Sequence, residues 1–93
     1  MSTEISDNAA ENRYEIKVDG DLAGFVVYER RGSEVVLVHT EVAPAFEGKG
    51  VGGSLARGVL DDLRAKNLSV VPLCPFIKGW IDRHPDYQDL VVS

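Results

Sequence analysis

Cysteine, long apolar runs and positive charge are all scarce in this 93-residue sequence, and each shortage excludes a class of protein. Its one cysteine cannot form an internal disulfide, which favours the reducing cytoplasm as the expected location. The first residues lack the charged start and apolar stretch of a signal peptide. No apolar run approaches the length that crosses a membrane. We therefore expect a cytoplasmic protein without a membrane partner.

The charge balance is acidic, with Lys and Arg totalling 10 against 15 Asp and Glu, for a formal net charge of −5. This balance argues against nucleic acid as a broad electrostatic partner, although it leaves room for a local basic pocket. No group of His, Cys and Asp has metal-ligand spacing, so we expect no metal. The length predicts a single domain with one modest core, and the lack of a spare apolar face predicts a monomer.

The N-terminal half of the chain has the pattern of a β-meander. Residues 1–11 are polar and non-periodic, and we expect a flexible tail there, followed by a single domain over residues 12–93. Alternating or β-rich segments separated by Asp-Gly-Asp and Arg-Gly-Ser turns follow at residues 13–18, 23–30 and 34–42. We expect these segments to form three antiparallel strands.

The second half predicts a strand–helix–strand crossover and a final helix. Apolar residues recur every four positions from Val51 to Leu63, which predicts a helix of about four turns that ends at Asn67. The apolar segment 68–73 predicts a fourth strand, parallel to the third. Proline suits the first turn of a helix, so a shorter helix is expected from Pro75, and Pro85 should stop it.

Strict alternation also predicts the two faces of the third strand. We expect one apolar face to pack under the long helix and the opposite face to look to solvent or into a groove. The residues assigned to the apolar face are Val36, Val38, Thr40 and Val42. His39 and Glu41 are assigned to the other face.

Residues 42–53 carry the strongest functional signal in the chain. They read Val-Ala-Pro-Ala-Phe-Glu-Gly-Lys-Gly-Val-Gly-Gly, an apolar strand end, a proline turn and a glycine-rich loop that opens the helix. Glycine lets main-chain amides approach a ligand, and a helix N-terminus favours an anion. This pattern predicts a phosphate or pyrophosphate cradle. The alternative is a tight turn with close helix–sheet packing.

Two common phosphate loops do not fit this segment. A P-loop requires Ser or Thr after its Gly-Lys pair, but Lys49 is followed by Gly50. A dinucleotide fold requires a parallel sheet from the start and an acidic residue on the next strand, and both are missing here.

The loop resembles the acyl-CoA loop of the Gcn5-related N-acetyltransferases. Val42, Pro44, Phe46, Gly50 and Gly52 match that family's pattern in place, whereas Glu47 stands where the family usually has Gln or Arg. The His-Thr-Glu-Val segment before the loop and the Cys-Pro-Phe-Ile-Lys-Gly-Trp-Ile-Asp-Arg-His-Pro-Asp-Tyr segment near the end are similar to a minimal, YjdJ-type subfamily. Its members lack the N-terminal helices that form one wall of the acceptor site in larger relatives.

The resemblance implies a small α/β domain that binds acetyl-CoA or CoA. Its mixed sheet would begin with the antiparallel meander, and the third and fourth strands would splay apart to admit the cofactor. A central helix would follow the glycine loop, and a second helix would close the domain. The residues implied in cofactor binding are Thr40, Val42, Glu47, Gly48, Lys49, Gly50, Val51, Gly52, Gly53, Cys74 and Lys78.

Three side chains are candidates for the chemistry of acetyl transfer. Cys74 directly precedes Pro75, and a thiol at a helix N-terminus is shifted toward thiolate, so it is a candidate general acid or transient acyl carrier. The alternative role for Cys74 is that of a small buried hydrophobe. His39 and Glu41 are candidate bases for an amine, or else plain solvent-exposed side chains.

The function implied is acetyl transfer from acetyl-CoA to an amine. An exposed protein lysine, a protein N-terminus or a polyamine would suit an open acceptor site, and the acidic chain favours a cationic acceptor. The alternative is a module that binds CoA or acyl-CoA with little or no catalysis.

Overall fold

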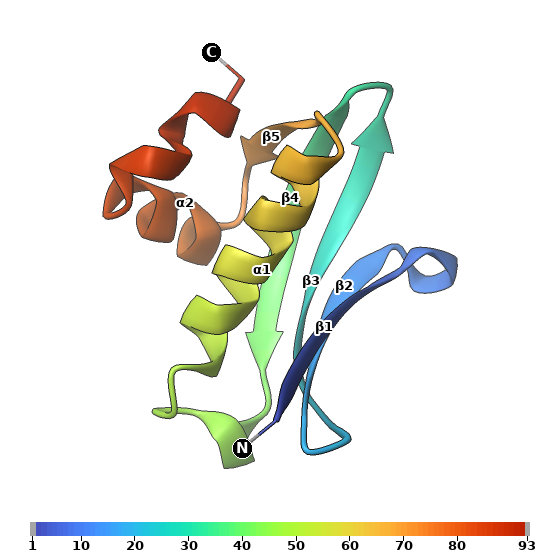
Figure 1. Cartoon of the computed structure of the whole chain (residues 1–93), viewed down its shortest axis with the longest axis vertical. Coiled ribbons are helices and arrows are strands. Elements are labelled where there is room, and N and C mark those ends of the chain that lie inside the picture. Colours follow the sequence, from blue (N-terminus) through green and yellow to red (C-terminus); the bar gives the residue numbers. More distant parts are fainter. Residues whose placement is uncertain (1, 93) are drawn as a thin grey trace.

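The computed structural model describes residues 2–92, which form one five-stranded sheet with its helices packed on one face (Figure 1). The strands are β1 (Thr3–Asn8), β2 (Arg13–Val18), β3 (Asp21–Arg31), β4 (Glu34–Val42) and β5 (Ser69–Pro72), in that spatial order. The helices are α1 (Val51–Ala65) and α2 (Pro75–Asp82), with short 3-10 turns η1 (Ala9–Glu11), η2 (Pro44–Phe46) and η3 (Pro85–Leu90). The predicted mixed sheet is confirmed, because β1 to β4 pair antiparallel and β5 pairs parallel to β4.

The expected flexible tail over residues 1–11 is wrong for the part that the structure describes. Thr3–Asn8 is strand β1, paired along its length with β2. The segment looked unstructured because it lies at an edge of the sheet, where only Ile5 packs against the core. Its Cδ1 atom lies over Gly58 of α1, in the space that a Cβ atom there would fill.

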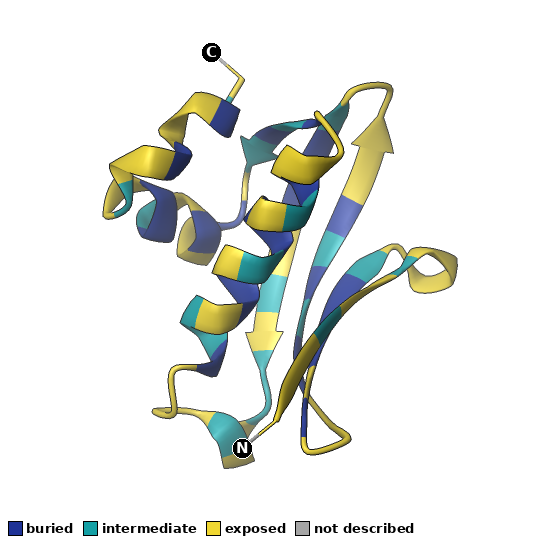
Figure 2. Ribbon diagram, in the orientation of Figure 1, coloured by how far each residue is buried: buried dark blue, intermediate teal, exposed yellow. Residues whose placement is uncertain are grey.

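The core lies between the sheet and the two helices (Figure 2). Helix α1 buries an apolar stripe with the helical spacing that the sequence predicted, and Leu55, Val59 and Leu60 are all 0% exposed. Asn67 ends this region with a φ of 57°, as predicted for a left-handed residue after a helix. None of the described helices is both long and apolar enough to cross a bilayer.

Strand β4 contains a β-bulge that strict alternation did not predict. Val27 pairs with His39 while Tyr28 pairs with Leu37, so Val38 is an extra residue without its own partner on β3. The bulge moves the apolar face from even to odd positions in the first half of the strand, where Val35 and Leu37 join the core. The prediction that Val36 and Val38 share the helix-facing side with Thr40 is therefore wrong.

A cluster of polar side chains joins the sheet to the end of α1. The Tyr14 hydroxyl donates to Asp62 at 2.5 Å, and the Tyr28 hydroxyl donates to Asp7 at 2.6 Å. Lys66 Nζ lies 2.7 Å from Asp62, four residues earlier in the sequence, and 3.7 Å from Asp7. We call these five residues the tyrosine cluster, and every charged or hydroxyl group in it has a partner.

Candidate functional site

Strands β4 and β5 separate after Leu37. Pro72 is the last β5 residue paired with β4, and the next two amides, of Leu73 and Cys74, both donate to the Leu37 carbonyl, at 3.0 and 2.9 Å. The chain then turns away into α2. Among the described residues, Val38–Val42 has no strand partner on this side, so β4 presents a free main-chain edge. This is the splayed pair of strands that the sequence resemblance implied.

The glycine loop connects the end of β4 to α1 and carries unpaired main-chain amides. Gly48 and Gly50 have φ values of 79° and 76°, which other residues adopt only with strain. A Cβ atom at either position would meet nothing within 4 Å, so both lie in open space. Within residues 2–92, no protein acceptor pairs with the amides of residues 48–53. The loop therefore offers amides to an outside acceptor at the positive end of α1.

Two other glycines of the loop have a packing role. A Cβ atom on Gly52 would lie 2.8 Å from Cζ of Phe76, and one on Gly53 would lie 3.7 Å from Nε1 of Trp80. Both aromatic residues belong to α2, so these glycines allow α2 to approach the first turn of α1. The packing alternative that the sequence left open is confirmed at Gly52 and Gly53, whereas the phosphate cradle at Gly48 and Gly50 stays a prediction.

Cys74 occupies the N-cap of α2, as the sequence predicted, but its side chain is buried and the residue is 3% exposed. Its Sγ atom lies 3.1 Å from Oγ1 of Thr40, across the gap between the separated strands. Because Thr40 pairs with the buried Val26, it lies on the helix side of the sheet. The thiol and hydroxyl therefore form a pair at the inner end of the gap.

His39 and Glu41 lie on the opposite face of the sheet from Cys74. They pair with Val27 and Phe25 and therefore share that face, where His39 Nε2 lies 3.5 Å from Glu41 Oε1. Both side chains are more than half exposed, at 58% and 59%. The structure thus brings the two candidate bases together and separates them from the candidate acid by the thickness of the sheet.

The charged residues predicted to bind the cofactor all lie at the surface. Lys78 pairs with Asp82 of the same helix at 3.5 Å, and its side chain is 64% exposed. Lys49 Nζ lies 5.9 Å from the centre of the Phe46 ring, and Glu47 is exposed at the start of the loop. None of these side chains is held in a fixed position by the core.

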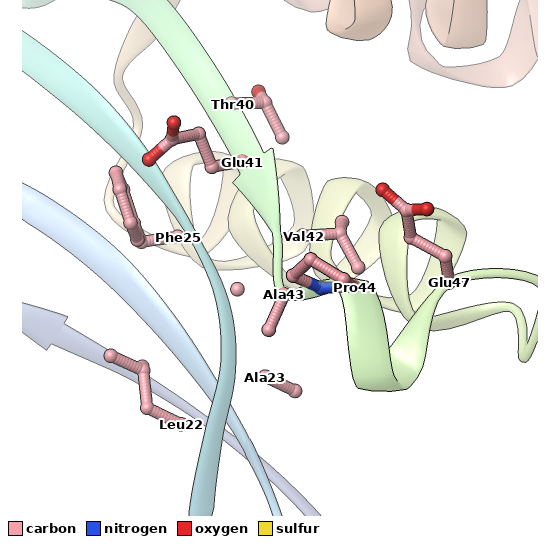
Figure 3. A pocket seen from close by; sticks show the side chains of 10 residues that line it. Leu22, Ala23, Phe25, Thr40, Glu41, Val42, Ala43, Pro44 and Glu47 are labelled. Carbon is pink, nitrogen blue, oxygen red and sulfur yellow. The ribbon is translucent and has the colours of Figure 1, made fainter.

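A pocket of about 500 Å³ lies beside the beginning of β3 and the C-terminal end of β4 (Figure 3). The sequence did not predict this pocket. Its wall includes Thr40, Glu41 and Glu47, which the sequence singled out, and Phe25 and Leu22, which it did not. Ala23, Gly24, Val42, Ala43 and Pro44 complete it. Only the register between β3 and β4 places Phe25 beside Glu41, and no local pattern in the sequence gives that register.

Comparison with known families agrees with this geometry. Residues 13–90 match the sequence model of a GCN5-related N-acetyl-transferase family, and the chain belongs to that family. It is 33% identical over 61 residues to Protein NATD1 of Gallus gallus, and equally to that of Mus musculus. Each match covers 64% of this chain and 56% of the relative, so the chain spans about half the length of these relatives.

Solved structures show the same fold. A GCN5-like protein of Staphylococcus aureus, described as a candidate N-acetyltransferase, matches 97% of this chain and 88% of its own, with a TM-score of 0.72 and 27% identity. Ard1 of Thermoplasma volcanium matches 68% of this chain and 44% of its own, with a TM-score of 0.57 and 28% identity. A ribosomal-protein-alanine N-acetyltransferase of Brucella melitensis, at 22% identity and a TM-score of 0.58, shares the fold over 87% of this chain and 61% of its own.

Proposed function

We propose that this protein binds acetyl-CoA and transfers its acetyl group to an amine. The observation that carries the proposal is the set of unpaired amides at residues 48–53, next to the free edge of β4. Family membership supports the same activity. We further propose that the protein acts as a single domain, as a cytoplasmic monomer and as a member of the minimal YjdJ-type subfamily.

The loop fits a diphosphate by its backbone more than by its side chains. The amides of residues 48–53 lie at the N-terminus of a 15-residue helix, where an anion is stabilised by about 0.3–1 kcal/mol or more. Lys49 adds a positive charge, whereas Glu47 adds a negative one where the family pattern that the loop resembles has Gln or Arg. We expect the main-chain amides to provide most of the affinity for the diphosphate, and we expect the Glu47 carboxylate to weaken that affinity.

The free edge of β4 provides main-chain groups for the rest of the cofactor. Val38–Val42 lacks a partner on the side of β5, so its carbonyls and amides can bond the pantetheine arm as a further strand would. In this arrangement the main chain of Thr40 and Val42 positions the arm, which directs the thioester toward the gap beside Cys74. We assign Lys78, on the exposed side of α2, as the contact for the 3′-phosphate in this proposal.

Bound acetyl-CoA supplies an activated acyl group, and the chain supplies positioning and proton transfer. We propose that the Cys74 thiol donates a proton to the departing sulfur atom, and its contact with Thr40 across the gap supports this role. On the other face, Glu41 and His39 are exposed and adjacent, and either can accept a proton from an amine directly or through water.

The alternative function is a CoA-binding module with little or no catalysis. One observation favours it: Cys74 is buried and separated by the sheet from His39 and Glu41, so the three do not form a single catalytic group. Cofactor binding is common to both functions, and only turnover distinguishes them.

Calorimetric titration with acetyl-CoA and CoA tests the common part. A mass-spectrometric screen of pooled amines, with wild type, Cys74→Ala and Cys74→Ser, tests catalysis. Loss of a general acid lowers the rate by about 10²–10⁴-fold, so we expect Cys74→Ala to lose most turnover while it keeps its cofactor affinity. Binding without any acetylated product would favour the module, and wild-type turnover by Cys74→Ala would remove the thiol from the mechanism.

A further inference from the structure

The pocket at the ends of β3 and β4 lies next to both parts of the proposed cofactor site. Glu47, in its wall, immediately precedes the amide loop, and Thr40, also in its wall, contacts Cys74 in the gap between β4 and β5. A molecule in the pocket would therefore lie alongside β4, with one end near the gap and the other near the loop. At a rise of about 3.4 Å per residue, the extended segment from Thr40 to Ala43, at the end of β4, is about 10 Å long.

The pocket wall is apolar along its length and acidic at two places. The apolar part comes from Leu22, Phe25 and Pro44, and its two charged residues are Glu41 and Glu47. No Lys or Arg is among the residues that line it. Figure 3 shows the Glu41 and Glu47 side chains on two sides of the end of β4. His39 contacts Glu41 from outside the wall, so a cation at Glu41 would share that carboxylate with the imidazole.

From this geometry we propose that the pocket binds the acceptor and selects a small aliphatic diamine or polyamine. One ammonium group is held at Glu47, the methylene chain lies on Phe25 and Leu22, and the second amine reaches the free edge of β4 beside Glu41, which shares the face of Phe25. The inference rests on the proposed acetyltransferase activity and names its acceptor. A volume of about 500 Å³ suits a small molecule, and the paired carboxylate and apolar surfaces match an acceptor with charged ends and an apolar middle.

The reaction balances for such an acceptor. The reactive amine first loses a proton to Glu41 or water, and its nitrogen then forms a C–N bond to the acetyl carbonyl carbon while the C–S bond breaks. A second proton leaves the nitrogen as the amide forms, and one proton returns to the sulfur. From an ammonium group and acetyl-CoA, the products are an acetamide, the CoA thiol and one proton released to solvent. The second ammonium group of the acceptor does not react and serves as the anchor.

Glu47→Gln is the variant that separates acceptor binding from cofactor binding. Removing this charge should raise the KM for butane-1,4-diamine about two- to fivefold, because Glu47 is exposed and water screens an ion pair there, and should change the KM for butan-1-amine much less. The same change should leave the affinity for acetyl-CoA equal or higher, because a negative charge near the diphosphate is removed. The matched control is Glu4→Gln, which makes the same change in charge at an exposed residue of β1 and should behave as wild type.

The outcomes distinguish this inference from the function on which it rests. Failure of the wild type to bind acetyl-CoA in calorimetry would overturn the proposed function. Binding of acetyl-CoA with no preference for the diamine over the monoamine, or with Glu47→Gln matching Glu4→Gln, would overturn only the acceptor assignment. Faster acetylation of a peptide N-terminus or lysine than of any diamine would also overturn the acceptor assignment.

Discussion

The two ends of α1 are built in opposite ways. Where the helix ends, the tyrosine cluster bonds it to β1, β2 and β3, and every charged or hydroxyl group of that cluster has a protein partner. Where the helix begins, the amides of residues 48–53 have no acceptor among the described residues, and the neighbouring edge of β4 has no strand partner. The first end stabilises the fold, and the second has main-chain groups available for a ligand. Substitutions at the two ends should therefore affect different measurements.

The largest effect on stability is expected under the tyrosine cluster. Leu63 is 1% exposed, and Leu63→Ala should lower the free energy of unfolding by about 2–5 kcal/mol through lost burial and a cavity. Leu73, which is 64% exposed, provides the matched control, and Leu73→Ala should change stability by less than about 0.5 kcal/mol. Urea denaturation measures both. Equal losses at the two leucines would contradict the comparison.

The next effect is on binding, at the beginning of the helix. Gly50→Val should cost about 1–2 kcal/mol of stability because Gly50 has a left-handed φ of 76°, and should weaken acetyl-CoA binding at least tenfold because the amides shift. Gly20→Val is the matched control, since Gly20 has a φ of 88° and equally open surroundings in the β2–β3 turn. It should lose similar stability and keep its affinity. Equal affinities of the two variants for acetyl-CoA would show that the loop does not bind the cofactor.

A smaller effect is expected from one hydroxyl of the tyrosine cluster. Tyr14→Phe removes the donor to Asp62 but leaves that carboxylate paired with Lys66, so we expect a loss of about 1–2 kcal/mol. The affinity for acetyl-CoA should not change. A change in affinity without a change in stability would show that the two ends are coupled through α1.

The last predicted effect is a loss of stability that is absent at neutral pH and appears only at alkaline pH. Burial and the hydrogen bond to Asp7 raise the pKa of Tyr28 to about 12, and burial and Asp62 raise that of Tyr14 as well. In the unfolded chain both ionise near pH 10, so their contribution is fully present below about pH 10 and is lost as the pH rises toward 12. Denaturation at stepped pH should show this fall, and Tyr14→Phe should reduce it. A flat profile from pH 9 to 12 would contradict these pKa shifts.

The sequence predicted the elements well because each depends on local patterns. The alternation over residues 13–18, the four-residue repeat from Val51 and the proline before the second helix each reflect periodicity or backbone chemistry within one element. Strand β1 escaped prediction because an edge strand that buries only Ile5 has no such pattern. The antiparallel and parallel pairings followed from the order of the elements and the length of their connections.

The site was only partly predictable for the same reason. The glycines before α1 identify the amide loop, because their spacing is local. The bulge at Val38, which decides the faces of β4, depends on pairing with β3 and has no signal in β4 alone. The contact of Cys74 with Thr40 and the place of Phe25 in the pocket wall likewise join distant segments. Residues 34 or 48 positions apart, as in Thr40–Cys74 and Tyr14–Asp62, meet only through the fold.

The most direct test of the account is an NMR titration of the main-chain amides with acetyl-CoA. We expect the signals of residues 48–53 to move, together with those of the free β4 edge at Val38–Val42, while those of Asp7, Tyr14 and Asp62 stay in place. Signals at residues 48–53 that remain unmoved at millimolar acetyl-CoA would contradict the central claim that these unpaired amides bind the cofactor.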